Sequence, residues 1–437
     1  MRRADLVAAL LALVLVAGAN LAITWGHWYP FRRIYAWAPP LFGYWHPHVG
    51  PGSPAAVVLG LAVVLRGPEL AARLRWRGLL CLAYGTGIGW TLFTHLIDGW
   101  RRGVPGRLAT SDEYLVDVPR ITDIPVFLRT FTSHILAGRP GSWAVHVSGH
   151  PPAATLTFVW LDRVGLGGPT AAAILVVLVG GLTVVAVPAT VRALGDERAA
   201  RALVPFLVVF PGAAIAGVSA DWLFAGVASS GVALLALGAV RERAVLTCFV
   251  AGLVLGWCLF LSYGLAGYLL VPLTVVVLAR NGWALAPALL GVAAVVVAFA
   301  GTGFWWLDGY HLVVQRYYQD VGRTRPDDYW VWANLAALAL SAGPAVAVGL
   351  RRGAGALRSR TRDARLVVPA LCCAAALAVA VADGSGLSKA ETERIWLPFA
   401  VWLAVSTSLI PARHRRWWLG AQVAVALVVR HLLWLQW

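Results

Sequence analysis

Acidic residues stand at three points where a carboxylate can do chemistry. Asp112 and Glu113 follow Ser111, and Asp221 lies two residues after Ser219. A carboxylate held beside an acceptor hydroxyl can act as its general base. Acids of this kind also occur in the first turn of helices that a serine caps, where they complement the helix dipole. The sequence leaves both roles open for each acid.

Cationic and imidazole groups form the second set of candidates. His150 comes directly before two prolines that fix the start of a helix, so it either marks that helix start or meets a phosphate or a sugar hydroxyl. Arg316, Arg325 and Arg394 are spread over later polar segments. They either extend from the membrane interface toward water or stabilise a phosphate through charge-assisted hydrogen bonds.

The chain that must position these residues is strongly apolar. Hydrophobic residues make up 59% of its 437 positions and charged residues 13%, which is more apolar than a soluble domain. Runs long enough to cross ~30 Å of hydrocarbon recur along it, and lipid offers the backbone no hydrogen-bond partner, so the runs must be helices. We therefore expect an all-α polytopic membrane protein.

Arginine clusters set the expected topology. The net charge of +16 would suggest nucleic acid in a soluble protein, but here arginines recur between apolar runs, as cytoplasmic loops do. We expect no nucleic-acid partner and a cytoplasmic N-terminus, because Arg2 and Arg3 precede an uncleaved first helix. About thirteen transmembrane helices are expected, at residues 5–25, 53–66, 79–97, 169–191, 200–218, 222–240, 245–262, 264–280, 283–304, 329–349, 366–383, 393–410 and 417–436.

The polar segments of this topology gather on the outer face. The largest is the outer loop 98–168, in which 151–166 should lie along the interface because a crossing there would place every later arginine cluster outside. All histidines except His414 fall in outer segments or at outer helix ends. The preference for Arg over Lys and the abundance of Ala, Gly and Val suggest a bacterial genome rich in G and C, so we expect a bacterial plasma-membrane protein.

The order of these features resembles a known family. An acidic pair, Asp112 and Glu113, precedes an amphipathic stretch with a tyrosine, then His150 and two prolines begin a helix, and Asp221 follows at the next outer turn. This order is similar to that of the GT-C superfamily of membrane glycosyltransferases, in the branch of protein O-mannosyltransferases and lipid A aminoarabinose transferases. Two further similar stretches are Gln315-Arg316-Tyr317-Tyr318 through Arg325-Pro326, and Glu393-Arg394-Ile395-Trp396-Leu397-Pro398.

The resemblance covers about residues 98–410 and implies an activity. GT-C enzymes transfer a sugar, with inversion, from a polyprenyl-phosphate donor to an acceptor on the outer face, here an envelope glycan, lipid or protein. It implies Asp112 as base, with Glu113 and Asp221 positioning the acceptor, or with Asp112 and Asp221 holding an optional divalent cation. The expected substrate-binding residues are His150, Arg316, Tyr317, Arg325, Glu393 and Arg394.

The chain also departs from the family. Three helices precede the acidic pair where the family usually has one, so residues 1–78 are expected to be two added transmembrane helices. Residues 79–410 would then form the GT-C-like core, and 411–437 a C-terminal helix. His150 stands where a lysine or another residue is often found.

Two other functions compete with sugar transfer. A transporter or lipid flippase would place ionisable groups near the bilayer midplane, whereas the acids here cluster at outer helix ends. A non-catalytic partner in envelope assembly would keep the fold without the acids. Membrane lipids are expected partners, and the sequence does not indicate an oligomeric state.

Overall fold

Long apolar helices form most of the molecule. The computed structural model describes residues 3–26, 29, 31–241, 244–358 and 366–437. Within these, eight helical segments are long and apolar enough to cross a membrane, or nine if one bent pair counts as a span. They are α1 (Arg3–Thr24), α3 (Ser53–Arg73), α4 (Trp76–His95, continued by η1 and α5 to Gly103), α9 with α10 (Pro169–Gly181 and Thr183–Ala193), α11 with α12 (Glu197–Val208 and Pro211–Ala216), α13 (Ala220–Ala239), η7 with α17 (Gly282–Ala284 and Leu285–Gly301) and α21 (Val367–Gly384).

The all-α membrane fold is confirmed, but the number of thirteen crossings is not. Three of the other expected helices are apolar and only 10–17 residues long in the described chain, below the ~20 residues that a perpendicular crossing requires. These are α14 (Val245–Leu261), α15 with α16 (Leu265–Tyr268 and Leu270–Ala279), and α23 with η9 (Leu397–Leu403 and Ala404–Leu409). The last expected helix is α24 (Ala412–Leu432), whose first turns are rich in arginine.

The expected single helix 329–349 is wrong, because the chain breaks there. Asp327–Ala342 (α19) and Pro344–Arg358 (α20) meet at a bend of 105°. Gly343 has a φ of +85°, which a residue with a side chain rarely adopts, and proline begins the next helix. The buried side chain of Gln422 accepts from the Ala345 amide at 3.2 Å and donates to the Ala342 carbonyl at 3.0 Å, so it satisfies the backbone groups that the break frees.

The interior of the bundle lies at α11, α12 and α13. Almost every residue of α11 and α12 is buried, whereas α1, α3 and α17 expose large apolar side chains such as Leu11 and Val297. In a membrane protein such exposed faces meet lipid. Helix α13 lies at the centre of the bundle, so Asp221 in its first turn is buried inside the protein.

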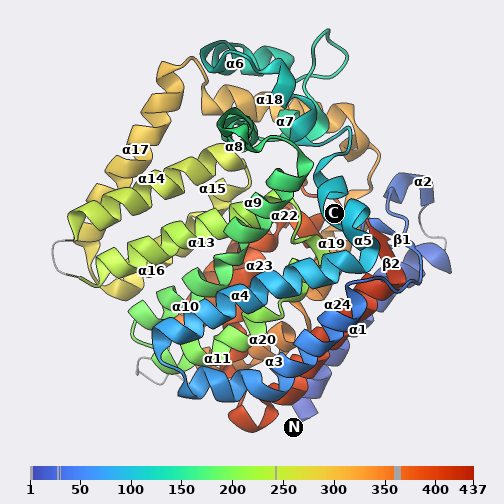
Figure 1. Cartoon of the computed structure of the whole chain (residues 1–437), viewed down its shortest axis with the longest axis vertical. Helices are drawn as coiled ribbons and strands as arrows, with labels where there is room; N and C mark the ends of the chain where they lie inside the picture. Colours follow the sequence, from blue (N-terminus) through green and yellow to red (C-terminus); the bar gives the residue numbers. More distant parts are fainter. Residues whose placement is uncertain (1–2, 27–28, 30, 242–243, 359–365) are drawn as a thin grey trace.

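Short helices cover one end of the bundle (Figure 1). The segments 98–168 and 305–328 meet there, since the Ala137 amide donates to the Gln319 side chain at 2.9 Å. Helix α8 has ten residues, too few for a crossing. The short elements of these segments are η1 (Leu96–Asp98), α5 (Gly99–Gly103), η2 (Pro105–Leu108), η3 (Tyr114–Val116), η4 (Val118–Arg120), α6 (Ile124–Thr130), η5 (Phe131–His134), α7 (Val145–Gly149), α8 (Pro152–Leu161), η6 (Asp162–Leu166), α18 (Trp306–Gln319) and η8 (Val321–Arg323). The short helix α22 (Thr392–Ile395) lies further inside, against α13 and α19.

A two-stranded antiparallel sheet joins the two terminal regions of the chain. Strand β1 (Gly43–Trp45), which follows the short helix α2 (Phe31–Ile34), pairs with β2 (Leu433–Leu435), and Tyr44 lies opposite Trp434. The sheet places residues 42–48 and the end of the chain beside the short helices.

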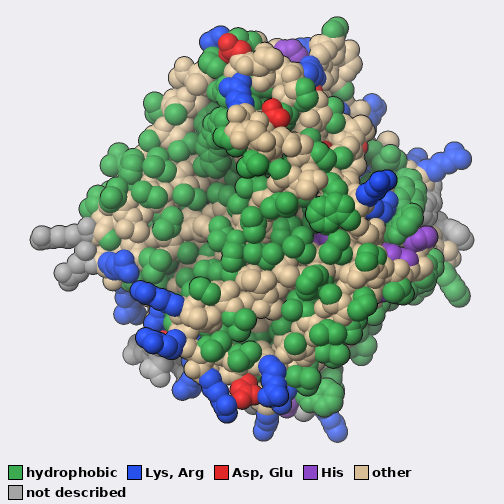
Figure 2. All heavy atoms as spheres, viewed as in Figure 1, with side chains coloured by type: hydrophobic (Ala, Val, Ile, Leu, Met, Phe, Trp, Pro, Cys, Tyr) green, Lys and Arg blue, Asp and Glu red, His purple; other side chains and the backbone are tan. Residues whose placement is uncertain are grey.

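Basic side chains gather at the opposite end. Figure 2 shows Lys and Arg along the lower left edge and the bottom, separated from the top by a broad apolar belt. Helix α1 begins at that lower end (Figure 1), where the buried carboxylate of Asp5 contacts Arg351 and Arg352. Arg201 donates there to the carbonyls of Ala71 and Leu74. The arginine-rich turns and the short helices of segments 98–168 and 305–328 thus lie at different ends.

Candidate functional site

Arg394 is the centre of a buried ionic network. Helix α22 places its side chain among the other helices, where it is only 4% exposed. Nη1 lies 2.9 Å from Oδ2 of Asp221, and Nη2 lies 2.9 Å from Oε2 of Glu391. The guanidinium also lies over the Trp437 ring, 4.6 Å from its centroid. One fixed cation therefore joins carboxylates that are 173 and 3 residues away in sequence.

His146 connects this centre to the acidic pair. Its Nε2 lies 3.3 Å from Nη2 of Arg394, and its Nδ1 lies 3.0 Å from Oε1 of Glu113. The His146 amide donates to the Asp112 carbonyl at 2.9 Å, so the turn that carries the acidic pair is held against α7. We call Glu113, His146, Asp221, Glu391 and Arg394 the Arg394 network.

Neighbouring positive charge lowers the pKa of two carboxylates of the network, Glu391 and Glu113, whereas burial raises the pKa of Glu393 to about 7. Burial by itself raises the pKa of Glu391, but Arg325 and Arg394 more than offset this and lower it to about 2. Burial likewise raises the pKa of Glu113, and the charge of His146 and its contact with the carboxylate bring it below the ordinary value. His146 itself loses basicity through burial, yet Glu113 outweighs that loss and its pKa is raised.

His150 lies beside the network and is neutral at pH 7. Burial lowers its pKa to about 4, although the charge of Asp221 acts in the other direction. Its ring packs at 5.7 Å from both Tyr114 and Phe224, and its Nδ1 lies 2.9 Å from the His146 carbonyl oxygen. A neutral imidazole can form hydrogen bonds with a ligand but does not supply a positive charge.

A second layer reaches the network through Glu391. Arg325 lies 3.3 Å from Oε1 of Glu391 and donates to the Lys389 carbonyl at 2.7 Å. The Lys389 ammonium, the one lysine of the sequence, is buried and contacts Asp327 at 2.7 Å. The Tyr317 hydroxyl accepts from the Lys389 amide at 3.2 Å. The loop that carries Lys389 thus links Arg325 and Tyr317 to the Arg394 network. The sequence did not indicate that this loop contributes to the site.

Three predicted residues are placed differently. The Asp112 side chain is exposed, beside the network rather than inside it. Arg316 pairs with Asp320 at 3.5 Å, one helical turn further along α18. Glu393 is buried, and its Oε1 accepts from the Phe42 amide at 2.9 Å, so it anchors the segment that leads to β1.

Sequence reasoning missed His146, Glu391, Lys389 and Trp437. His146 lies four residues before His150, and Glu391 lies three residues before Arg394. Both spacings place a pair on one side of a helix, a signal that could have been used. Trp437 carried no such signal, because its place under Arg394 depends on the pairing of β2 with β1.

Several buried polar atoms around the network have no protein hydrogen-bond partner. Within the described ranges these are Oε2 of Glu113, the Tyr114 hydroxyl, Nε of Arg394, Oε2 of Glu393 and Nε1 of Trp396. Buried polar groups are nearly always satisfied by protein, water or ligand. Unsatisfied donors and acceptors of this kind can bind the hydroxyls and phosphate oxygens of a polar ligand.

The carboxylates considered as metal ligands do not form a metal site in the described chain. Asp221 is bound to Arg394, and Asp112 is exposed. No group of three or more His, Cys, Asp or Glu side chains among the described residues is arranged to hold a metal ion.

Comparison with solved structures gives a distant match. It is the crystal structure of the Archaeoglobus fulgidus oligosaccharyltransferase in complex with Zn and sulfate, with 16% identity and a TM-score of 0.41. The match covers 73% of this chain, which spans about half (52%) of that one. No protein-family profile matches the sequence. No curated protein matches it either.

Proposed function

We propose that the protein is a GT-C-type membrane glycosyltransferase. In this proposal it transfers a sugar, with inversion, from a polyprenyl-phosphate donor to an envelope acceptor on the outer face. The observation that carries the proposal is the Arg394 network. A buried guanidinium, two carboxylates and a carboxylate–imidazole pair meet beside an exposed acid at the end of the molecule away from the arginine-rich turns.

Asp112 is the proposed base. Its exposed carboxylate is free to meet an acceptor hydroxyl, whereas Glu113 is engaged by His146. The acceptor oxygen bonds to the anomeric carbon while Asp112 takes its proton, and the bond from that carbon to the phosphate oxygen breaks. The lipid phosphate leaves with the bonding electrons, so a cation close to it stabilises the transition state.

Arg394 and Arg325 are the proposed cations. Asp221 and Glu391 fix the orientation of Arg394 and leave its Nε without a protein partner in the described chain. A guanidinium oriented in advance needs little reorganisation when charge develops on the leaving oxygen. Asp221 and Glu113 act as positioning residues, the first on Arg394 and the second on His146.

The broken helix α19–α20 is the one feature of the described chain that favours transport. Broken helices line the substrate sites of many transporters. Here Gln422 fills the break and satisfies its free backbone groups. The break is therefore closed by protein, and sugar transfer remains the better supported function.

The test is an assay of purified full-length protein with a panel of radiolabelled polyprenyl-phosphate sugars and an envelope lipid extract as acceptor. Asp112→Asn removes the base, and we expect transfer to fall about 10²–10⁴-fold with unchanged membrane insertion. Asp123→Asn is the matched control, because Asp123 lies in the same loop and caps α6 through its side chain, a role that asparagine fills equally well. Equal transfer by Asp112→Asn and Asp123→Asn would remove Asp112 as base.

A further inference from the structure

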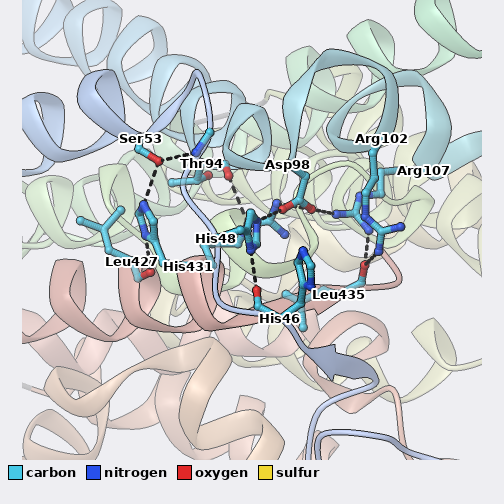
Figure 3. Close-up of polar contacts among 12 residues, drawn as sticks. His46, His48, Ser53, Thr94, Asp98, Arg102, Arg107, Leu427, His431 and Leu435 are labelled. Carbon is cyan, nitrogen blue, oxygen red and sulfur yellow. Dashed lines mark hydrogen bonds and ion pairs between the residues drawn. The ribbon is translucent and has the colours of Figure 1, made fainter.

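A second buried charge cluster surrounds Asp98 (Figure 3). Oδ2 of Asp98 accepts a hydrogen bond from Arg107 and lies 2.8 Å from Nη2 of Arg430. Oδ1 of the same carboxylate lies 2.8 Å from Nε2 of His48. Arg102 reaches the same place and donates to the Leu435 carbonyl at 3.3 Å. We call these five side chains the Asp98 cluster.

The cluster carries more positive than negative charge. Arg107 and Arg430 are 4% and 0% exposed, and the single carboxylate between them is fully buried. Arg102 adds a third guanidinium at the partly exposed edge. Burial and the neighbouring charge of Arg430 lower the pKa of Arg107 to about 9. Buried charge without a counter-charge is strongly unfavourable, so the surplus favours the binding of an anion.

Unused hydrogen-bond donors accompany the surplus charge. Nη1 of Arg430, Nε of Arg107 and Nε of Arg102 are buried without a protein hydrogen-bond partner in the described parts of the chain. A guanidinium has five N–H groups and no acceptor. These atoms can therefore only be satisfied by an acceptor such as a carboxylate, a phosphate or water.

The position of the cluster selects the kind of anion. Asp98 and Arg102 lie at the end of the apolar segment Trp76–Gly103, where a spanning helix leaves the hydrocarbon. Trp100, two residues before Arg102, is exposed, and so is Trp45 on strand β1, which pairs with β2. Arg102 lies 4.3 Å from the centroid of the Trp434 ring. Tryptophans of this kind mark the depth of lipid headgroups, where phosphate is the abundant anion.

We propose that the Asp98 cluster binds the phosphate of a lipid headgroup, with Arg102 at the entrance and Arg430 and Arg107 behind it. The cluster also has a structural role, because Arg102 and Arg107 donate to the Leu435 carbonyl and so hold β2. These contacts use only one donor of each side chain. That role leaves the charge surplus without explanation. The site is separate from the Arg394 network and does not depend on sugar transfer.

The experiment measures lipid binding to purified full-length protein in neutral detergent, with no sugar donor present. The probes are dioleoyl phosphatidic acid, dioleoyl phosphatidylcholine and inorganic phosphate. We expect phosphatidic acid to bind about tenfold more tightly than phosphatidylcholine, and Arg102→Ala to lose about tenfold, the effect of one charge-assisted hydrogen bond. Arg430→Met should also lose this binding, and it leaves Asp98 paired with Arg107, which preserves a neutral buried pair.

Arg101→Ala is the matched control, because Arg101 is the exposed neighbour of Arg102 with the same charge. It should change the affinity less than twofold, as surface charges do. Equal binding of the two lipids by the unaltered protein would overturn the proposal, and so would an equal loss in Arg101→Ala and Arg102→Ala. If inorganic phosphate binds as tightly as phosphatidic acid, the site binds free phosphate and the proposal of a lipid ligand is overturned. These outcomes do not depend on whether the protein transfers a sugar, because the binding assay contains no sugar donor.

Discussion

The Arg394 network and the Asp98 cluster lie on either side of the end of the chain and have opposite charge balance. Trp437 packs under Arg394, and the Leu435 carbonyl accepts from Arg102 and Arg107. In the network, one guanidinium contacts Asp221 and Glu391. In the cluster, one carboxylate contacts two guanidinium groups and a histidine.

This difference indicates different tasks. In the network, Asp221 and Glu391 hold Arg394 in one orientation, which suits a cation that meets charge as it develops on a leaving oxygen. Cations that outnumber the carboxylate suit the binding of an anion.

Loss of Arg394 should have the largest effect. Arg394→Met leaves Asp221 buried without its cation and removes one of the two partners of Glu391. We expect the stability to fall by about 3–5 kcal/mol, the usual result of breaking a buried ion pair. Thermal unfolding in detergent measures this, and Arg316→Met, at an arginine paired with the exposed Asp320, is the control that should change little. Equal stability of the two variants would contradict a central role for Arg394.

Loss of Asp98 should come next. Asp98→Asn leaves Arg107 and Arg430 facing each other, and we expect a loss of about 3 kcal/mol, since both arginines keep backbone acceptors at Leu435 and Thr94. Addition of phosphatidic acid should recover part of that loss, whereas it should not recover stability in Arg394→Met. If the lipid stabilises both variants equally, the two sites do not differ as described.

The pair of His146 and Glu113 should show a characteristic pH dependence. The raised pKa of His146 means that its contribution to stability is complete below its ordinary value of 6.5 and is lost as the pH rises through the folded-state value. The lowered pKa of Glu113 means that its contribution is present above 4.5 and is lost as the pH falls. The stability difference between the unaltered protein and His146→Gln should therefore be largest between about pH 4.5 and 6.5. A difference that grows from pH 6.5 to 9 would contradict the pairing.

Tyr317→Phe should have the smallest effect. It removes only the hydroxyl that accepts from the Lys389 amide at 3.2 Å. The expected loss is about 1 kcal/mol, because the buried amide is left without this partner. Tyr318→Phe, at the exposed neighbouring ring, is the matched comparison and should change the stability less.

The sequence predicted the helices better than their membrane spans. Hydrophobic runs placed every expected helix near a real one, because burial in lipid requires apolar side chains all round. The sequence did not reveal the break at Gly343, because the side chain that caps it, Gln422, is 79 residues away. It also could not fix the number of crossings where helices such as α14 and α16 are short and lie inside a larger bundle.

At the site, residue types identified some of the functional candidates, but the sequence did not show which side chains meet. Asp221 was a candidate because a carboxylate at such a helix end is costly without a partner, and Arg394 because its segment resembles a GT-C motif. The structure makes each the partner of the other. His146 and Glu391 were overlooked, since neither stands in a motif. The whole Asp98 cluster was overlooked as well, because it forms only when β2 brings α24 to the outer loop.

The most direct way to distinguish sugar transfer from transport uses sealed proteoliposomes that contain a radiolabelled polyprenyl-phosphate sugar and an outer acceptor. Both the labelled product and the movement of the lipid across the bilayer are measured. We expect labelled acceptor from the unaltered protein, about 10²–10⁴-fold less from Asp112→Asn, and the same slow lipid movement in both. Lipid movement that requires the protein, with no labelled acceptor from any donor, would contradict it.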